Sequence, residues 1–263
     1  LYIQKGRSGF RGKGSCLLHR KGEKQMQPLE LYIHIPFCVK KCAYCDFLSG
    51  PAGEKEKEEY VKMLVDEIRN CPDTVQNYRV ISIFFGGGTP SLLTGEQIGR
   101  LMDTVREIFT LDEDAEITME MNPGTVTEEK LRKYRQAGVN RLSIGLQSVN
   151  DEELRLLGRI HTYEEFLEAY HLARANGFAN INVDLISAIP GQTVESWRRT
   201  LEQVMALFPE HISAYSLILE EGTTFYKKYV EDEAKEGPKL PDEDAERQMY
   251  WDTEMLMEKN GYH

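Results

Sequence analysis

The chain has 263 residues, of which 41% are hydrophobic, and this is enough for one α/β barrel domain or two small domains with a real core. A net charge of −11 argues against broad nucleic-acid binding, because that needs a basic face to neutralise phosphates. No apolar run approaches the roughly 18 residues of a membrane span, and no secretion signal is recognisable, so we expect a cytoplasmic protein without a transmembrane segment.

The first 25 residues differ from the rest of the chain in charge. They carry seven basic side chains and one acidic side chain, a net charge of +6, which leaves −17 for the remainder. They are rich in glycine, lack apolar periodicity and precede Met26. We therefore expect residues 1–25 to be disordered and outside the native fold. Translated upstream sequence, or a tail that binds nucleic acid or a membrane surface, are the alternatives for this segment.

Six short strands, rich in β-branched and aromatic residues, alternate with amphipathic helical stretches from residue 31 onward. The expected strands are Leu31–Ile35, Arg79–Phe85, Glu116–Met121, Arg141–Leu146, Asn180–Ile186 and His211–Leu217. This alternation predicts repeated βα units around a parallel sheet. Six units make an α/β fold of the open partial (β/α)6, TIM-like barrel type, with a site at the C-terminal ends of the strands.

Local signals place the ends of several helices. Capping boxes, in which a side-chain oxygen and a Glu or Gln three residues later satisfy free backbone amides, are expected at Thr94 with Gln97, Asn150 with Glu153, and Thr162 with Glu165. Gly138 and Gly177 fall where two helices should end before the next strand. A stripe at four-residue spacing, Trp197, Leu201 and Met205, is expected to face the core.

The last part of the chain is interpreted as the beginning of a further domain. After the sixth strand, a charged stretch and a helical run from Asp242 to Lys259 lead into Gly261-Tyr262-His263, where another strand would be expected to start. We therefore expect residues 26–229 to form the barrel, and residues 230–263 to be the start of a C-terminal domain that is truncated here.

Five cysteines do not make the paired framework of a secreted disulfide domain, because three of them crowd into eight residues. Cys38, Cys42 and Cys45 follow the first strand, at the expected site-bearing edge of the sheet; Cys16 and Cys71 are interpreted as ordinary thiols. A structural zinc site normally takes four protein ligands, and no second cysteine pair follows, so an iron–sulfur cluster is favoured over zinc. Three thiolates leave one iron of a four-iron cluster open, and that iron can chelate S-adenosylmethionine and deliver an electron to its sulfonium.

The segment from Tyr32 to Phe47 reads Tyr-Ile-His-Ile-Pro-Phe-Cys-Val-Lys-Lys-Cys-Ala-Tyr-Cys-Asp-Phe. It resembles the radical S-adenosylmethionine superfamily, in the branch that holds the oxygen-independent coproporphyrinogen III oxidases and the HemW-type haem chaperones. The resemblance covers residues 29–263 almost without a gap. It implies a [4Fe-4S] cluster on the three cysteines, S-adenosylmethionine and haem as ligands, a haem-acceptor protein, and a flavodoxin- or ferredoxin-type reductant.

Further residues match the cofactor contacts of this branch. The stretch Phe-Gly-Gly-Gly-Thr-Pro follows the second strand, and a tight strand-to-helix turn is the simpler explanation for it. The resemblance implies instead that Gly87, Gly88 and Thr89 contact the amino group of S-adenosylmethionine. Tyr32 and Tyr44 also resemble positions that contact the cofactor.

Charged and amide side chains near the ends of later strands are the other candidates. Glu120 ends the third strand, where a carboxylate could accept ribose hydroxyls, with a solvated glutamate as the alternative. Asp184 lies within the fifth strand among Ile and Val, where a carboxylate is costly to bury unless it is paired or bonded, so we expect a cation or ligand partner such as Arg159. The resemblance implies that residues matching Gln147, Arg159 and Asp184 bind a second S-adenosylmethionine in the oxidases. No catalytic residue beyond the cluster is assigned.

Three functions of different classes remain open. The resemblance implies either a HemW-type haem chaperone or an oxygen-independent coproporphyrinogen III oxidase, which decarboxylates a propionate side chain by radical chemistry. The oxidases carry a further cysteine two positions beyond the triplet, where this chain has Phe47. They also have a longer region before the first strand, which here starts five residues after Met26. Both features favour the chaperone; a zinc-binding structural module is the third candidate.

Haem binding is expected to be weak in this chain. Chaperones of the HemW type continue into a C-terminal domain with a His-Asn-x-x-Tyr-Trp motif associated with haem. Residues 26–259 contain no equivalent of this motif. We therefore expect haem binding to need that C-terminal region.

Overall fold

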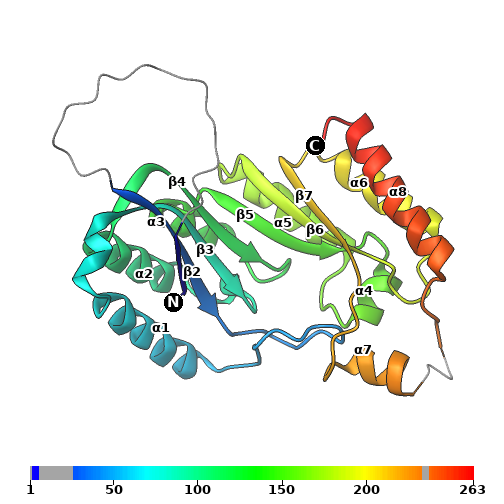
Figure 1. Cartoon of the computed structure of the whole chain (residues 1–263), viewed down its shortest axis with the longest axis horizontal. Helices are drawn as coiled ribbons and strands as arrows, with labels where there is room; N and C mark the ends of the chain where they lie inside the picture. Colours follow the sequence, from blue (N-terminus) through cyan, green and yellow to red (C-terminus); the bar gives the residue numbers. More distant parts are fainter. Residues whose placement is uncertain (1, 6–25, 233–236) are drawn as a thin grey trace.

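The chain folds around a seven-stranded sheet in a computed structural model that describes residues 2–5, 26–232 and 237–263 (Figure 1). The strands lie side by side in sequence order: β1 Tyr2–Lys5, β2 Gln27–Ile35, β3 Tyr78–Gly87, β4 Thr110–Met121, β5 Arg141–Gln147, β6 Asn180–Ser187 and β7 His211–Ser216. Strands β2 to β7 run parallel and curl into an open partial barrel. The expected arrangement of six parallel strands is confirmed.

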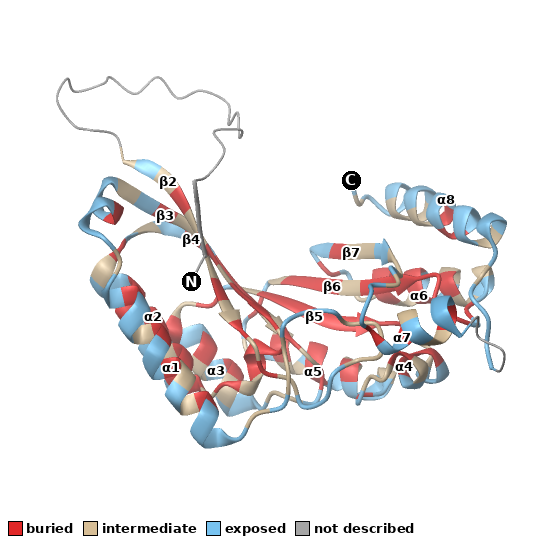
Figure 2. Ribbon diagram, turned by 60° about the horizontal axis from the view of Figure 1, so that its bottom comes forward, coloured by how far each residue is buried: buried red, intermediate tan, exposed pale blue. Residues whose placement is uncertain are grey.

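Helices follow the strands and cover one face of the sheet. They are α1 Glu54–Arg69, α2 Gly95–Ile108, α3 Glu128–Ala137, α4 Asp151–Leu157, α5 Tyr163–Ala175, α6 Val194–Met205, α7 Thr224–Tyr226 and α8 Glu243–Lys259, with short turns at η1 Asp73–Asn77, η2 Pro90–Leu92 and η3 Lys227–Glu231. Figure 2 shows α1, α2, α3 and α5 beneath the sheet. None of the described helices combines the length and hydrophobicity needed to cross a membrane.

The two faces of the sheet differ in chemistry because side chains alternate along each strand. Along β2, Leu31 and Ile33 are buried in the core shared with the helices, whereas Tyr32 between them is only partly buried. The inner face of later strands is polar: Asn182 donates to Ser143 Oγ (2.8 Å) and Ser213 donates to Asn182 Oδ1 (3.0 Å). A polar inner face leaves a surface on which a ligand can be bound.

Strand β1 lies in the segment that we expected to be disordered, and for residues 2–5 that expectation is wrong. These residues pair antiparallel with β2, with Tyr2 opposite Tyr32 and Lys5 opposite Leu29. The pairing satisfies backbone groups that β2, as an edge strand, would otherwise leave open. Residues 6–25 lie outside the described residues.

Strand β4 begins at Thr110, six residues before the expected start at Glu116. The early part of the strand is acidic, so the alternation of apolar residues does not identify it as a strand. It is held instead by backbone pairing of Thr110 with Arg79 and by an ion pair between Arg79 Nε and Asp112 Oδ2 (3.0 Å). A shift in register after Val80 joins this extension to the rest of the ladder.

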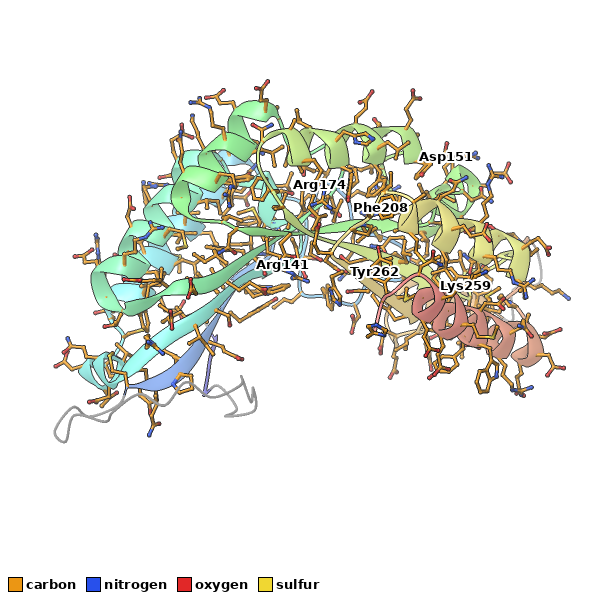
Figure 3. All side chains as sticks on the ribbon, turned by 90° about the horizontal axis from the view of Figure 1, so that it is seen from above. Arg141, Asp151, Arg174, Phe208, Lys259 and Tyr262 are labelled. Carbon is orange, nitrogen blue, oxygen red and sulfur yellow. The ribbon has the colours of Figure 1, made fainter. Side chains whose placement is uncertain are left out.

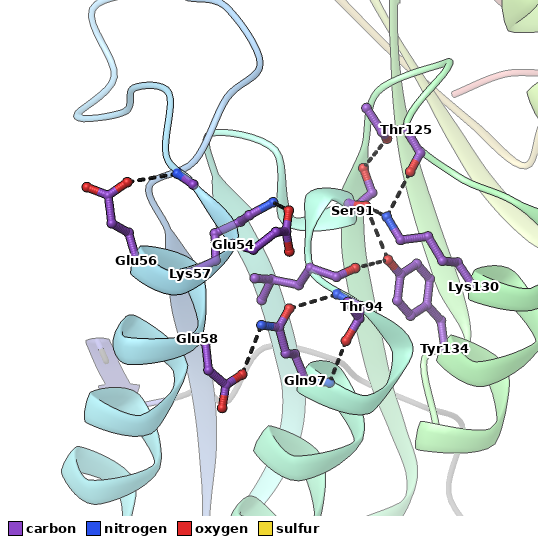
Figure 4. Close-up of polar contacts among 12 residues, drawn as sticks. Glu54, Glu56, Lys57, Glu58, Ser91, Thr94, Gln97, Thr125, Lys130 and Tyr134 are labelled. Carbon is purple, nitrogen blue, oxygen red and sulfur yellow. Dashed lines mark hydrogen bonds and ion pairs between the residues drawn. The ribbon is translucent and has the colours of Figure 1, made fainter.

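Two of the three expected capping boxes are present. At the start of α2 the Thr94 side chain accepts from Gln97 N, and Gln97 Oε1 accepts from Thr94 N, as Figure 4 shows; the box at Thr162 and Glu165 also forms. The third expectation is wrong, because Asn150 caps α4 through Glu152 N.

The missing partner of that third box, Glu153, is buried instead of turning back to the helix end. Its carboxylate accepts from Ser148 Oγ (2.6 Å) and Gln192 Nε2 (2.9 Å), and also from Ser196 Oγ. Three donors, from the loops before α4 and α6 and from the first turn of α6, outcompete a single backbone amide for this side chain.

Helix α8 packs on α6 through the buried Trp197. The indole Nε1 donates to the Met249 carbonyl (3.1 Å) and to Thr253 Oγ1 (2.9 Å), and Arg198 Nε pairs with Asp252 Oδ2 (2.6 Å). Residues 243–259 thus share the core of the sheet; a domain boundary near residue 230 stays a prediction.

The end of the chain lies against the start of β7 (Figure 3). Tyr262 Oη donates to the Pro209 carbonyl (2.9 Å), and Arg174 Nη2 donates to the Phe208 carbonyl (3.1 Å). These bonds tie the turn before β7 to both the last residues and α5.

The two tryptophans provide a matched test of this packing. We expect Trp197→Ala to lower the free energy of unfolding by about 3–5 kcal/mol, because it removes a fully buried ring and its two hydrogen bonds. The control Trp251→Ala, on α8 and 52% exposed, should cost within about 0.5 kcal/mol. Urea unfolding followed by far-ultraviolet circular dichroism measures both, and equal effects would contradict the α6–α8 packing described here.

Candidate functional site

The cysteine loop, residues 36–50, follows β2 and is fixed by backbone hydrogen bonds to distant segments. Cys38 N donates to Gly50 O (2.9 Å), which closes the loop on itself. Ala43 N donates to Leu157 O at the end of α4, and Ala43 O accepts from Phe225 N in α7, both at 2.9 Å. The loop is therefore clamped between two helices, with its three cysteines on the side of the sheet edge.

A cavity of about 290 Å³ lies between this loop and the C-terminal ends of the strands. Of the residues expected at the site, its lining contains Cys38, Cys42, Tyr44, Cys45, Gly87, Gly88, Thr89, Glu120, Gln147, Arg159 and Asp184. They come from the cysteine loop and from β3, β4, β5, the α4–α5 connection and β6. The structure thus brings these residues together at the C-terminal ends of the strands, as expected.

Tyr32 lies apart from this lining. Its ring stacks on Phe84, with centroids 6.1 Å apart, and its hydroxyl is 3.2 Å from His34 Nδ1. His34 Nε2 in turn lies 3.1 Å from the Leu48 carbonyl, so this pair supports the far end of the cysteine loop. A cofactor contact by Tyr32 stays a prediction.

Gly87 and Gly88 let the end of β3 approach the cysteine loop. Gly87 has φ +115°, and a Cβ there would lie 2.6 Å from the His34 ring. A Cβ at Gly88 would lie 2.6 Å from the Phe37 carbonyl oxygen and 3.0 Å from Cys38 Sγ. Both glycines are therefore needed for the packing of the loop, in addition to any contact with a ligand.

Glu120, in the lining of the cavity, is held by the backbone of β3. Its Oε2 accepts from Gly87 N (3.0 Å). Burial, together with the nearby charge of Asp184, raises the pKa of Glu120 to about 7, and the Gly87 hydrogen bond only partly opposes this. Glu120 is partly buried and bonded to a backbone amide, which differs from a freely solvated glutamate; a contact with ribose hydroxyls stays a prediction.

Asp184 has different partners from the one expected. Its carboxylate accepts from Ser143 Oγ (2.9 Å) and Asn182 Nδ2 (2.7 Å), both on the inner face of the sheet, and the described contacts include no ion pair with Arg159. Neighbouring strands bring these donors close enough to satisfy the carboxylate without a cation. Burial still raises the pKa of Asp184 above its ordinary value.

Arg159 points instead at the cysteine loop. Its Nη2 donates to Asn122 Oδ1 (2.6 Å) and to the Gly145 carbonyl (2.7 Å), while Nη1 donates to Cys42 Sγ (3.7 Å). Arg159 Nε is buried without a partner, and so is Oε1 of Gln147, whose backbone has φ +78°. Buried polar atoms without partners are costly, so one donor and one acceptor at the cavity suit a polar ligand.

Several residues of the lining were missed by sequence reasoning. They are Asn122, which follows β4, Ser143 and Gly145 within β5, and Tyr215 near the end of β7. Asn122 directly follows β4, and a polar residue at the C-terminal end of a predicted parallel strand is a signal that could have identified it. Tyr215 carries no such signal, because aromatic residues in strands usually mark the core.

The donor set fits a cluster better than a single metal ion. Within the described residues, no three Cys, His, Asp or Glu side chains gather closely enough to hold one ion. The three cysteines nevertheless line one cavity. Thiolates that bind different irons of a [4Fe-4S] cluster surround it and do not converge on one point, as they must around zinc.

The raised pKa of Glu120 predicts a measurable pH effect on stability. A carboxyl whose pKa rises from 4.5 to about 7 on folding stabilises the protein below pH 4.5, and this contribution is lost as pH rises to about 7. We expect wild-type protein to lose up to about 3 kcal/mol more than Glu120→Gln between pH 4.5 and 8. Exposed Glu113→Gln, also on β4, is the control and should follow the wild-type profile; urea titrations across this range decide it.

Comparisons with known proteins agree with this site. Residues 32–204 match the radical SAM superfamily. The chain is 43% identical over 239 residues to the haem chaperone HemW of Escherichia coli, covering 90% of this chain and 61% of that protein. It is 36% identical to the mitochondrial radical S-adenosyl methionine domain-containing protein 1 of Danio rerio, covering 89% of this chain and 52% of that one. The chain thus spans about three fifths or less of these relatives.

A solved structure supports the same placement. Coproporphyrinogen III oxidase HemN of Escherichia coli, described as a radical SAM enzyme, superposes with a TM-score of 0.81 at 31% identity, covering 92% of this chain and 54% of that one. The superfamily implies S-adenosylmethionine and a [4Fe-4S] cluster. With its three-cysteine loop at the C-terminal edge of a curled parallel sheet, the chain belongs to the radical S-adenosylmethionine superfamily.

Proposed function

We propose that Cys38, Cys42 and Cys45 hold a [4Fe-4S] cluster that binds S-adenosylmethionine, and that the chain serves in a haem chaperone of the HemW type. The observation that carries the first part is the shared cavity: one loop brings three thiols, and four strands bring polar groups, to the same space. When bound, the cluster supplies an electron to the sulfonium of S-adenosylmethionine.

The residues around the cavity have separate tasks in this proposal. Glu120, fixed by Gly87 N, accepts hydrogen bonds from the ribose hydroxyls in this proposal. The backbone from Gly87 to Thr89 approaches without side-chain obstruction at the two glycines and can meet the amino group. Arg159 Nε and Gln147 Oε1 offer a buried donor and acceptor to the ligand.

The choice between chaperone and oxidase depends on Phe47 and on the relatives. Phe47 stands where the oxidases have a further cysteine, and it is 59% exposed at the cavity lining. Relatives named as haem chaperones reach 43% identity, compared with 31% for the oxidase structure. Since the chain spans 61% of that chaperone, delivery of haem to an acceptor protein and the identity of the reductant belong to the proposal. The TM-score of 0.81 keeps the oxidase as the second candidate.

Two histidines of the barrel, His161 and His211, do not line the cavity next to the cysteine loop. His161 Nε2 lies 3.2 Å from the Leu146 carbonyl, and burial beside Arg159 lowers the pKa of His161 to about 3. His211 Nδ1 lies 2.9 Å from Arg141 Nη2. This supports weak haem binding by the chain alone.

Substitution of the cysteines tests the cluster. After anaerobic reconstitution, Cys38→Ala, Cys42→Ala and Cys45→Ala should each abolish the visible iron–sulfur absorption, because each removes one thiolate ligand. Cys71→Ala and Cys16→Ala are the matched controls and should retain it; Cys71 lies outside the cavity and Cys16 outside the described residues. Loss of the cluster from Cys71→Ala would overturn the ligand assignment.

Parallel assays separate the two functions. We expect the reconstituted chain to show no decarboxylation of coproporphyrinogen III, and to bind haem more weakly than full-length HemW of Escherichia coli, as followed by the Soret band. Decarboxylation above the level of a Cys42→Ala control would favour the oxidase. Haem binding as tight as that of the full-length relative would place a haem site within these 263 residues.

A further inference from the structure

A continuous series of hydrogen bonds joins two of the cluster cysteines, and Asn122 is at its centre. Asn122 Nδ2 donates to Thr89 Oγ1 (2.8 Å), and Thr89 Oγ1 donates to Cys38 Sγ (3.7 Å). On the other side, Arg159 Nη2 donates to Asn122 Oδ1 (2.6 Å), and Arg159 Nη1 donates to Cys42 Sγ (3.7 Å). One amide thus connects both residues that donate to thiol sulfurs.

The direction of every bond in this series is determined by chemistry. Arg159 can only donate, so the amide oxygen of Asn122 must face it and the amide nitrogen must face Thr89. A hydroxyl has one hydrogen; because Thr89 Oγ1 accepts from Asn122, its own hydrogen is left for Cys38. Both ends of the series therefore present donors to sulfur.

The space for these contacts is provided by Gly145. A Cβ at that position would lie 3.1 Å from Asn122 Oδ1 and 3.3 Å from Arg159 Nη2. Both are tighter than ordinary contacts, so a larger residue would press on the junction of the two side chains. The Gly145 carbonyl also accepts from Arg159 Nη2, which fixes the guanidinium from a second side.

The backbone that carries Thr89 and Asn122 is rigidly supported. Asn122 N donates to Ser91 Oγ (3.3 Å), and Thr125 Oγ1 donates to the Asn122 carbonyl (2.6 Å). Figure 4 shows Lys130, from α3, donating to the carbonyls of Ser91 and Thr125, at 2.7 and 2.9 Å. The turns after β3 and β4 are therefore held together, and the amide of Asn122 with them.

We infer that Asn122 is a positioning residue that raises the reduction potential of the cluster, by holding Thr89 and Arg159 as hydrogen-bond donors to the thiolates of Cys38 and Cys42. The inference rests on the proposed cluster. Hydrogen bonds to cluster sulfurs stabilise the more electron-rich reduced state and so raise the potential. The cation of Arg159, kept beside Cys42 by Asn122, acts in the same direction.

Two substitutions of Asn122 remove its action in different ways. Asn122→Ala removes both bonds and frees the two donors from their orientation. Asn122→Asp keeps the shape and the acceptor for Arg159, but it presents an oxygen to Thr89, whose hydroxyl hydrogen then turns away from Cys38. Its negative charge shifts the potential in the same direction, so the uncharged Asn122→Ala is the more specific of the two. The control is Asn140→Ala, because Asn140 also bonds β4 through its amide, at the Ala115 carbonyl (2.8 Å) and Ile117 N (2.8 Å), in the middle of the strand and outside the cavity lining.

The experiment is a redox titration of the reconstituted proteins without S-adenosylmethionine, followed by electron paramagnetic resonance of the reduced cluster. Iron and sulfide contents are measured first. We expect the midpoint potential to shift to more negative values in Asn122→Ala and Asn122→Asp, and to stay at the wild-type value in Asn140→Ala. A wild-type potential in cluster-loaded Asn122 variants overturns the inference.

A variant that does not fold, or that binds no cluster, is replaced by a second test. If Asn122→Ala holds no cluster, Asn122→Asp and Thr89→Val decide together. Thr89→Val keeps the side-chain shape and adds no charge, and it removes the donor to Cys38 together with the acceptor for Asn122 Nδ2. Unchanged potentials in these two overturn the inference, and more negative ones support it. A wild-type chain without iron and sulfide would instead overturn the proposed cluster itself.

Discussion

The two backbone hydrogen bonds of Ala43 connect the cysteine loop to the rest of the protein. One goes to the last residue of α4 and the other to α7, so the loop follows β2 but takes its position from segments more than a hundred residues later in the chain. Gly88 completes the clamp, because only a residue without a side chain lets β3 end against Cys38. The packing that orders the sheet therefore also places the three thiols.

The inner face of the open barrel is polar, which is unusual for a parallel sheet. Parallel sheets are normally buried on both faces, yet here the inner face carries Ser143, Asn182 and Asp184, which satisfy one another by hydrogen bonds. A self-satisfied polar layer can stay in place while a ligand enters or leaves. Glu120 is the exception: its only described partner is one backbone amide, and burial leaves its pKa near neutrality.

Arg159 is one of three cationic residues in the lining of the cavity, with Lys40 and Lys41. It does not neutralise the nearest buried carboxylates; it is shared between Asn122, the Gly145 carbonyl and Cys42. Because Arg159 does not pair with Asp184, that carboxylate depends on neutral donors. The cysteine loop, in turn, has a positively charged neighbour. For a group of thiolates that must gather negative charge around a cluster, a fixed cation is a direct electrostatic advantage.

The sequence by itself determined the six parallel strands, most helix ends and the three-cysteine loop, because these are local: periodicity, capping and spacing act within a few residues. The tertiary structure alone decided which distant groups meet. It paired Asp184 with Ser143 and Asn182 in place of Arg159, turned Glu153 inward, and placed Asn122 between Thr89 and Arg159. Each of these contacts depends on the register of neighbouring strands and on loops far apart in the chain, and a local pattern carries no information about either.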